Sequence, residues 1–382
     1  MSGKIGGIGA RITMRIERIE ISRHSLTLDP PFAAAWDSRP RRDFIADIVQ
    51  VFADDGSVGI GSGDSMAGID DYLDHFIGGD PRDIDRHFKV LDNIAFHVGR
   101  PWPLDIALWD LLGKIEGKPV YRLLGGTEGR IRTYASLGVL RTEADLAAQA
   151  RRLAEAGFPA IKIRFQRPDV TDDLAALAAV RMAVGPDVQL MVDCNQGWRM
   201  PWDTQPPWTY DKARSVAREL EKLGVYWMEE PLHRGDYAGM ASLRSATTLM
   251  IAGGEMTREL HELRTLVERR CLDVLQPDCV LTGGITGLHR VGLYAKHNGV
   301  VFTPHTWGNG IGLMANLHLV AGLGGTPFVE FPYDPPDWTP ERRDFPLALP
   351  LYPDAHGYVA VPDAPGLGLE LNEELLDRTR IG

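Results

Sequence analysis

The chain has 382 residues, of which 44% are hydrophobic and 24% are charged, so it is long enough for two or three domains of ordinary globular composition. A formal net charge of -11 argues against nucleic acid or an anionic membrane as a partner, because both bind basic surfaces. The three cysteines lack metal-site spacing, and no stretch approaches the roughly 20 apolar residues of a membrane span. We expect a cytoplasmic protein whose thiols are buried.

The first part of the chain predicts strands before helices, which is typical of a small α+β domain that we place at residues 14–131. Residues 43–63 contain two strand-like runs joined at Asp55 and Gly56, a pair that favours a hairpin. In residues 1–13, glycine stands where a signal peptide needs an apolar run, so we expect a loose leader there.

Residues 132–349 repeat a different pattern, in which short apolar runs alternate with helical segments. Eight apolar runs, separated by helical segments, favour a closed parallel barrel of βα units. The alternative is an open doubly wound sheet, but the chain has no G-x-G-x-x-G sequence and no phosphate-binding loop. We expect the tail, residues 350–382, to return and pack on the first domain. The runs are RTYASL (from 132), AIKIRF (160), VQLMVD (188), VYWMEE (225), TLMIAGGE (248), LDVLQ (272), VVFTPH (300) and FVEFP (328).

Polar residues interrupt these apolar runs at or just after their carboxyl ends, which is the face of a barrel where active sites lie. One such residue is usually a cap or a supporting hydrogen bond, but seven consecutive runs carry them, which favours one shared site. Lys162 and Arg164 point to the same side of one strand, and two buried cations need an anion. The full set is Lys162, Arg164, Asp193, Asn195, Glu229, Glu230, Glu255, Asp278, His305 and Glu330.

Three of these runs supply carboxylates in succession: Asp193, then Glu229 or Glu230, then Glu255. Converging carboxylates repel one another unless they are protonated or share a cation. All-oxygen donors favour a hard ion such as Mg²⁺, whereas zinc prefers histidine or cysteine and Ca²⁺ takes more protein oxygens. The sequence thus predicts a magnesium site at the carboxyl ends of these strands.

Two further residues form a candidate acid–base pair. His305 ends one run and Asp278 follows the preceding one. A carboxylate bonded to one ring nitrogen orients a histidine and raises its basicity. Spacing alone leaves a structural histidine equally open, but a position opposite a metal and a cation pair makes His305 a candidate base.

Together these residues resemble the enolase superfamily, specifically its mandelate racemase-like subgroup, the mandelate racemase/muconate lactonizing enzyme family. The resemblance covers nearly the whole chain. It implies an α/β fold, a modified TIM barrel (β/α)7β with an N-terminal α+β capping domain, and it implies a magnesium cofactor. The motifs that carry it are RPWPLDIALWDLLGKIEGKPVYRLLGG, MVDCNQGW, WMEEP, GGE, LDVLQPD, TPHTWGNGIG and GLGLELNEELL.

The resemblance also implies a role for most of the strand-end residues. Asp193, Glu229 and Glu255 would bind Mg²⁺, and His305 with Asp278 would form the catalytic dyad. Glu230 would stand behind the metal ligands instead of binding the ion itself.

By the same resemblance, the partner would be a small-molecule carboxylate, a sugar acid. Lys162 would contact its carboxylate, and Glu330 would hydrogen-bond that carboxylate as in some members of the family. Asn195 would face a substrate hydroxyl, and we group Trp307 with the substrate-binding residues. The anion that balances Lys162 and Arg164 would then be the substrate.

Arg164 departs from the racemase pattern, which has a second lysine base at this position. Arginine stays protonated in proteins, so it is a poor base, and His305 remains the one good base. This favours β-elimination of water over two-base racemisation: His305 removes the α-proton and then, as imidazolium, protonates the leaving 3-hydroxyl. The implied function is a Mg²⁺-dependent aldonate or aldarate dehydratase that forms a 2-keto-3-deoxy acid through an enediolate.

Other functions stay open. An epimerase, a racemase or a lactone cycloisomerase would use the same enediolate, and a cycloisomerase also needs only one good base. A sugar-acid binding protein is the non-enzymatic alternative. We further expect a homo-oligomer.

Specificity is expected to come from two loops of the first domain, 22–42 and 61–68, which close over the barrel mouth in this family. Arg23 and His24 in the first loop are candidates to hold a distal part of the substrate. The segment 199–211 lengthens one connection of the barrel and is either an ordered loop near the site or a surface excursion.

Overall fold

The computed structural model describes residues 14–63 and 65–382, so the leader expected at 1–13 lies outside the described residues. A three-stranded antiparallel sheet comes first, in the order β1-β2-β3. The turn between β2 and β3 contains Gly56 at φ 88°, a left-handed conformation that glycine adopts without a steric penalty. The strands are β1 (Ile16–Phe32), β2 (Arg41–Ala53) and β3 (Val58–Gly63).

Helices follow this sheet and share a core with it, which includes Val49, Leu91 and Leu104. The approach of α2 to β3 depends on glycine, since a Cβ at Gly61 would lie 2.0 Å from Pro103 O. Sheet and helices together form the cap. The helices are η1 (Asp70–His75), α1 (Ile84–Ile94), α2 (Trp102–Ile115) and α3 (Val120–Leu123).

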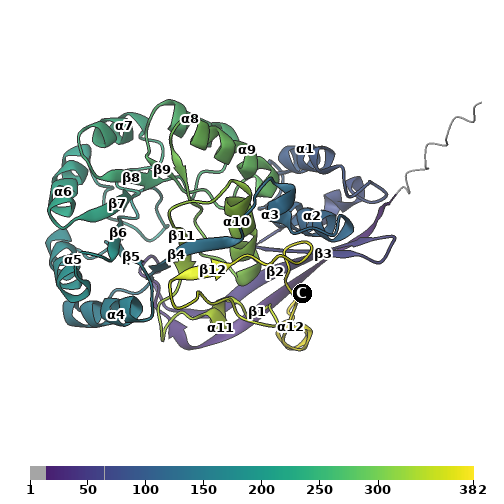
Figure 1. Cartoon of the computed structure of the whole chain (residues 1–382), viewed down its shortest axis with the longest axis horizontal. Coiled ribbons are helices and arrows are strands. Elements are labelled where there is room, and N and C mark those ends of the chain that lie inside the picture. The colour runs from purple at the N-terminus through teal and green to yellow at the C-terminus, as the bar shows by residue number, and fades with distance from the viewer. Residues whose placement is uncertain (1–13, 64) are drawn as a thin grey trace, which may run out of the picture.

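Eight parallel strands, β4 to β11, form the barrel, and a helix follows each of the first seven (Figure 1). Their order is β10-β9-β8-β7-β6-β5-β4-β11, so the first and last barrel strands are neighbours. Thr306 Oγ1 donates to Glu330 O (2.9 Å) and links the segment after β10 to β11. All eight strands lie where the sequence predicts them, and the (β/α)7β barrel with an α+β cap is confirmed.

The strands of the barrel are β4 (Arg130–Ser136), β5 (Ala160–Arg164), β6 (Gln189–Asp193), β7 (Val225–Glu229), β8 (Met250–Gly253), β9 (Val274–Leu275), β10 (Val301–Phe302) and β11 (Val329–Pro332). Its helices are α4 (Glu143–Glu155), α5 (Val170–Val184), α6 (Tyr210–Lys222), α7 (Tyr237–Ser245), α8 (Leu260–Glu268), α9 (Gly284–His297) and α10 (Gly310–Gly322).

The strand register brings the polar strand ends to one level. Arg164 is paired with Asp193 across β5 and β6, and Asp193 is paired with Glu229 across β6 and β7. Glu255 follows shortly after the end of β8. Because carboxyl ends of parallel strands meet at one edge, these side chains share one end of the barrel.

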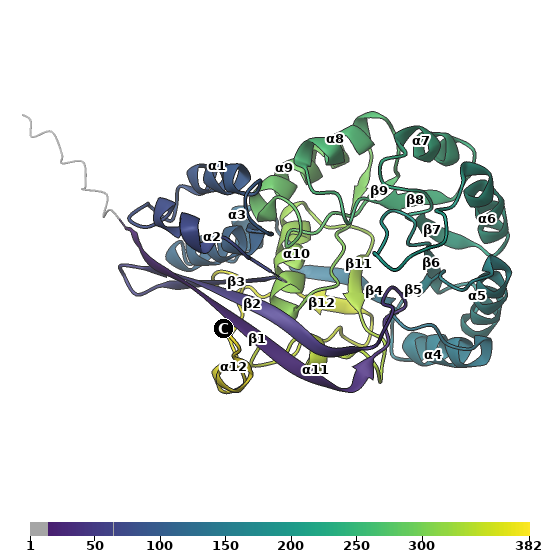
Figure 2. The same cartoon turned by 180° about the vertical axis from the view of Figure 1, so that it is seen from behind.

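The tail returns along both the cap and the barrel (Figure 2). It contains α11 (Pro340–Arg343), β12 (Tyr358–Ala360) and α12 (Glu373–Thr379), and β12 pairs antiparallel with β4. Leu367 N donates to Asp110 Oδ1 on α2 (2.6 Å), and Ile381 N donates to Arg23 O on β1 (2.8 Å). The strand β12 has no counterpart among the elements that the sequence predicts.

The region 22–42 corrects one expectation, because most of it is strand. Residues up to Phe32 belong to β1, and β2 begins at Arg41, so the connecting loop is short. His24 is buried, and its ring is bonded to Leu376 O (3.0 Å) and Ser22 Oγ (2.8 Å). It therefore anchors the C-terminal helix and does not reach a substrate.

His318 on α10 joins the cap, the barrel and the tail. Its Nδ1 accepts from Tyr121 N (3.1 Å), which leaves Nε2–H to donate to Leu367 O (3.1 Å). Burial lowers the pKa of His318 to about 4, although the bond to Leu367 O opposes that shift. The ring is thus neutral in the folded protein, and protonation would destroy the acceptor that Tyr121 N needs.

This geometry predicts a pH-dependent stability. Since the folded pKa lies below the unfolded value of about 6.5, the contribution of His318 is complete above that pH and is lost as pH falls through about 4. The shift corresponds to about 3 kcal/mol. His318→Gln keeps a donor and an acceptor but cannot titrate, so its melting temperature should fall less than that of the parent between pH 7 and pH 4.5. Parallel curves for the two proteins would contradict the assignment.

Candidate active site

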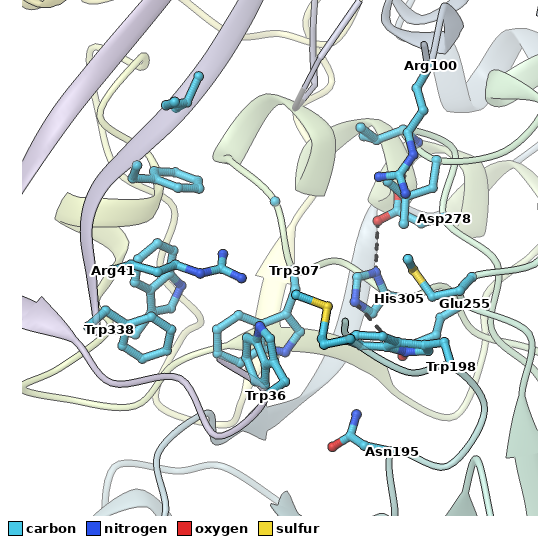
Figure 3. A pocket seen from close by; sticks show the side chains of 18 of the residues that line it. Trp36, Arg41, Arg100, Asn195, Trp198, Glu255, Asp278, His305, Trp307 and Trp338 are labelled. Carbon is cyan, nitrogen blue, oxygen red and sulfur yellow. Dashed lines mark hydrogen bonds and ion pairs between the residues drawn. The ribbon is translucent and has the colours of Figure 1, made fainter. Parts of the chain in front are cut away.

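A cavity of about 440 Å³ lies where the cap meets the carboxyl ends of the barrel strands (Figure 3). That volume is in the range of small-ligand sites. The barrel contributes Arg164, Asn195, Trp198, Glu255, Asp278, His305 and Trp307, and the cap contributes Arg23, Trp36, Arg41, Asp43, Phe44 and Arg100.

Asp193, Glu229 and Glu255 form a buried carboxylate group, of which Glu255 lines this cavity. One oxygen from each lies within 4.8 Å of the others, and Glu255 Oε2 has no hydrogen-bond partner among the residues that the structure describes. Burial raises the pKa of Glu229 and of Glu255, and the neighbouring Asp193 adds to this effect. A hard divalent cation would relieve the repulsion, so the donor set fits the predicted Mg²⁺.

Other side chains hold these carboxylates in place. Trp198 Nε1 donates to Glu255 Oε1 (2.7 Å). Gln276 Nε2 (2.8 Å) and Trp227 Nε1 (3.1 Å) both donate to Glu229 Oε2. Sequence reasoning missed these three residues as part of the site, although each lies in or beside a quoted motif: MVDCNQGW, LDVLQPD and WMEEP.

Lys162 is fully buried between two carboxylates. Its Nζ lies 2.5 Å from Glu229 Oε1 and 2.7 Å from Glu330 Oε1. Burial alone would lower the pKa of Lys162, but the charges of Glu229 and Glu330 raise it, so the amine stays protonated. Ser136 Oγ (2.8 Å) and Thr306 N (2.8 Å) also donate to Glu330. Lys162 and Glu330 therefore lie beneath the cavity, while Arg164 lines it.

Arg164 is fixed on several sides. Its Nη1 is paired with Asp193 Oδ2, and its Nε donates to Leu137 O (3.0 Å). The guanidinium carbon also lies 4.8 Å from the ring centre of Trp36 and 5.5 Å from that of Trp307. Trp36 belongs to the cap, so a residue of the cap completes the surroundings of a barrel cation.

His305 and Asp278 form the predicted pair. His305 Nδ1–H donates to Asp278 Oδ2 (3.1 Å), and Nε2 lies 4.0 Å from Glu255 Oε2 (Figure 3). Asn316 Nδ2 donates to Asp278 Oδ1 (2.8 Å) and fixes the carboxylate. Burial alone would lower the pKa of His305, but the charge of Glu255 and the bond to Asp278 raise it to about 9. The bond to Asp278 thus gives His305 the orientation that a general base needs, and a cation bound beside Glu255 would offset the charge that keeps the ring protonated.

The remaining predicted residues also lie near the site, except His24. Asn195, at φ 47°, lines the cavity, and its backbone N donates to Asp193 Oδ1 (2.9 Å). Trp307 lines it and donates from Nε1 to Ser136 Oγ (3.0 Å). Arg23 lines the cap end. Within 199–211, Trp202 Nε1 donates to Trp36 O (3.3 Å), so this segment lies beside the site instead of leaving it.

Fold and site together define a barrel enzyme of the enolase type, with carboxylates that could hold a metal ion at the ends of successive strands and a histidine–aspartate pair beyond them. The chain belongs to the mandelate racemase/muconate lactonizing enzyme family. Residues 17–125 match its N-terminal domain, "Mandelate racemase / muconate lactonizing enzyme, N-terminal domain", and residues 145–375 match "Enolase C-terminal domain-like".

Three similar proteins illustrate the range of this family. D-galactarolactone cycloisomerase of Agrobacterium fabrum is 31% identical over 96% of this chain and 99% of its own length. Arabinonate dehydratase of Saccharolobus solfataricus is 32% identical over 72% of this chain and 70% of its own length. The crystal structure of D-glucarate dehydratase from Agrobacterium tumefaciens complexed with magnesium is 26% identical, with a TM-score of 0.84 over 97% of this chain and 100% of that chain.

Proposed function

We propose that the protein is a Mg²⁺-dependent sugar-acid dehydratase that converts an aldonate or aldarate to a 2-keto-3-deoxy acid. The observation that carries this proposal is the arrangement of one histidine base opposite an arginine. In the strand order, His305 follows β10 and Arg164 ends β5, on opposite sides of the strands β6 to β8 that supply the carboxylates. Of these two residues, His305 can accept a proton once a cation offsets the charge of Glu255, whereas Arg164 stays protonated.

When bound, Mg²⁺ would be held by Asp193, Glu229 and Glu255 and would supply positive charge to the enediolate that forms when the α-proton leaves. His305 Nε2 takes that proton, and the charge of Asp278 stabilises the imidazolium. The imidazolium then gives its proton to the leaving 3-hydroxyl, so one water is lost and an enol remains.

The enol tautomerises to the 2-keto-3-deoxy acid. Lys162 and Arg164 contribute fixed positive charge beside Asp193 and Glu229, which favours the more negative transition state over the bound substrate. In this role Lys162 acts from beneath the cavity, and Glu330 keeps it in place.

A lactone cycloisomerase is the second candidate. It is favoured by the match to D-galactarolactone cycloisomerase over nearly the full length of both chains. Its chemistry also needs an enediolate and one base, so Arg164 is compatible with both activities.

The molecule that binds in this site is proposed to be a small carboxylate.

Among residues 14–63 and 65–382, no helix is both long enough and apolar enough to cross a membrane. The expected homo-oligomeric state and cytoplasmic location stay predictions.

A panel of aldonates, aldarates and sugar-acid lactones, incubated with the enzyme and Mg²⁺, tests the proposal. We expect at least one acid to yield a product lighter by one water that reacts as a 2-oxo acid. A product of unchanged mass with an opened or rearranged ring would establish the cycloisomerase instead. Failure to convert any acid of the panel would contradict both candidates.

Arg164 also predicts one-sided proton exchange. In D₂O, a substrate or slow analogue should exchange its α-proton in only one configuration at C2, as followed by NMR. Arg164→Lys should add slow exchange of the opposite configuration, because lysine can serve as a base on that side. Arg167→Lys is a matched control, since Arg167 pairs with Asp173 (2.7 Å) outside the cavity lining. Equal exchange of both epimers by the parent enzyme would point to a racemase or epimerase.

A further inference from the structure

Asn309 connects the loop that carries His305 to the cap. It stands at the end of the loop between β10 and α10, directly before the helix. Its Oδ1 accepts from Ile311 N (3.1 Å) and Gly312 N (3.3 Å), so it caps α10, while its Nδ2 donates to Ser62 Oγ (2.6 Å) on β3. Both Asn309 and Ser62 are buried. One side chain therefore joins the loop of the base, a barrel helix and a strand of the cap (Figure 2).

The helix cap alone does not account for an asparagine at position 309. A cap needs only a short side chain with an oxygen, which serine or aspartate would supply equally well. The contact with Ser62 additionally needs a donor that reaches as far as β3, and a single amide provides both groups. Asn309 thus combines a local role in α10 with a contact across the junction of barrel and cap.

Ser62 extends this contact to the cap end of the cavity. Its Oγ donates to Asp47 O (2.8 Å) on β2. The carboxylate of Asp47 is also buried, accepts from Met66 N (2.9 Å) and lies 3.4 Å from Arg23 Nε. Arg23 lines the cavity. A series of contacts through Asn309, Ser62 and Asp47 therefore runs from the loop of the base to a cation at the cap end.

The end of β3 also packs on the loop that carries Asp278. A Cβ at Gly63 would lie 3.0 Å from Val280 Cγ1, and a Cβ at Gly312 on α10 would lie 2.7 Å from Val280 Cγ2. Val280 N in turn donates to Asp278 Oδ1 (2.9 Å). Because protein interiors are packed as tightly as molecular crystals, β3 has little room to shift against this loop. The loops of both dyad residues thus meet one strand of the cap.

Resting on the proposed function, we infer that Asn309 and Ser62 are positioning residues, which hold the loop of His305 and the Arg23 end of the cap in register. An acid bound between these two ends then presents its α-carbon to the base at a fixed distance. A misplacement of about 1 Å can cost about 10²-fold in rate. Asn309 and Ser62 are not part of the cavity lining, so they act through the residues that they hold.

Asn309→Ser tests the contact while it keeps an oxygen for the helix cap, because serine is too short to reach Ser62. With the acid of the panel that the parent converts fastest, kcat should fall about 10- to 100-fold. KM should change by a smaller factor, because the groups that bind substrate at each end of the cavity remain. Calorimetry should give a Mg²⁺ affinity like that of the parent, since the three carboxylates belong to the barrel.

Ser62→Ala removes the same contact from the side of the cap and should lower kcat by a similar factor. If the two side chains act through one contact, the double variant should be no slower than the slower single variant. Losses that multiply in the double variant would overturn the inference, because they would indicate two independent effects.

His318→Leu is the matched control. It removes another contact between α10 and the cap, the bond from Tyr121 N, outside the cavity lining. Its melting temperature should fall at least as far as that of Asn309→Ser, while its kcat stays near that of the parent. A loss of kcat in proportion to the loss of stability, in the control as in Asn309→Ser, would reduce Asn309 to a contributor to stability.

Reaction of His305 with diethyl pyrocarbonate in the presence of Mg²⁺ provides a readout without turnover. The side chain of His305 is 12% exposed, so a loosened cap should make it react several-fold faster in Asn309→Ser and Ser62→Ala. Peptide mass spectrometry locates the modified histidine, and His318→Leu should react like the parent.

The two readouts separate this inference from the proposed function. Faster modification of His305 in both variants of a protein that converts no acid would support the positioning role and contradict the proposed function. An unchanged kcat in both variants would overturn the inference, while conversion of an acid by the parent would still support the proposed function. If no acid is converted, an unchanged rate of modification would overturn the inference as well.

Discussion

Asp278→Asn is expected to lower turnover by roughly 10²- to 10⁴-fold, the range that general acid–base catalysis supplies. The asparagine oxygen can still accept from His305 Nδ1, so the ring keeps its place. The neutral asparagine side chain, however, cannot offset the positive charge that the imidazole gains on protonation. Steady-state kinetics should therefore show the loss in kcat, while binding of the substrate carboxylate changes little.

Asp273→Asn is the matched control for this experiment. Asp273 precedes the same strand, β9, at its opposite end, and it pairs with Arg244 (2.7 Å) and accepts from Ile251 N (2.9 Å). Its replacement should lower the melting temperature and leave turnover nearly intact. Near-normal turnover in Asp278→Asn would reduce Asp278 to a structural hydrogen bond and leave the proposed base without support.

The barrel and its strand-end residues could be predicted because both depend on local sequence. A buried strand is a short apolar run, and a polar residue at its carboxyl end stands out against that run. Once eight such runs close into a barrel, their ends must converge. Asp193, Glu229, Glu255 and His305 come together for this reason, although they are far apart along the chain.

The contacts between strands and loops could not be predicted in the same way. No pattern in the sequence indicates that Lys162 pairs with Glu330, or that Trp198 supports Glu255, because these partners depend on three-dimensional packing. The sequence predicts a loop over 22–42, but most of this region belongs to the long hairpin of β1 and β2. His24 illustrates the consequence, since its partner is the C-terminal helix.

The cap is more than a cover over the barrel, because it touches a cation of the site directly. Ala35 N donates to Gly138 O (2.8 Å) just after β4, which fixes the short loop between β1 and β2 against the barrel. Trp36 follows in that loop and meets Arg164. A change in the loop would therefore alter both the shape of the cavity and the position of a charged group in it.

Chelation of the metal is expected to abolish turnover, and Mg²⁺ should restore it. Glu255→Gln should prevent this restoration, because the variant loses one charged ligand. Thermal unfolding provides a readout besides activity: Mg²⁺ at 100 times its Kd should stabilise the parent by about 2.7 kcal/mol. Trp198→Phe removes the hydrogen bond to Glu255 and should weaken Mg²⁺ binding about 10- to 100-fold.

The metal-free proteins distinguish loss of a ligand from damage to the fold. Without Mg²⁺, Glu255 adds a buried charge that repels Asp193 and Glu229, so Glu255→Gln should be at least as stable as the parent in EDTA. Added Mg²⁺ should then raise the melting temperature of the parent and of the control Glu259→Gln, whose side chain is exposed, but not that of Glu255→Gln. Full turnover in EDTA, or an equal Mg²⁺-induced shift in Glu255→Gln, would show that these carboxylates do not form the metal site.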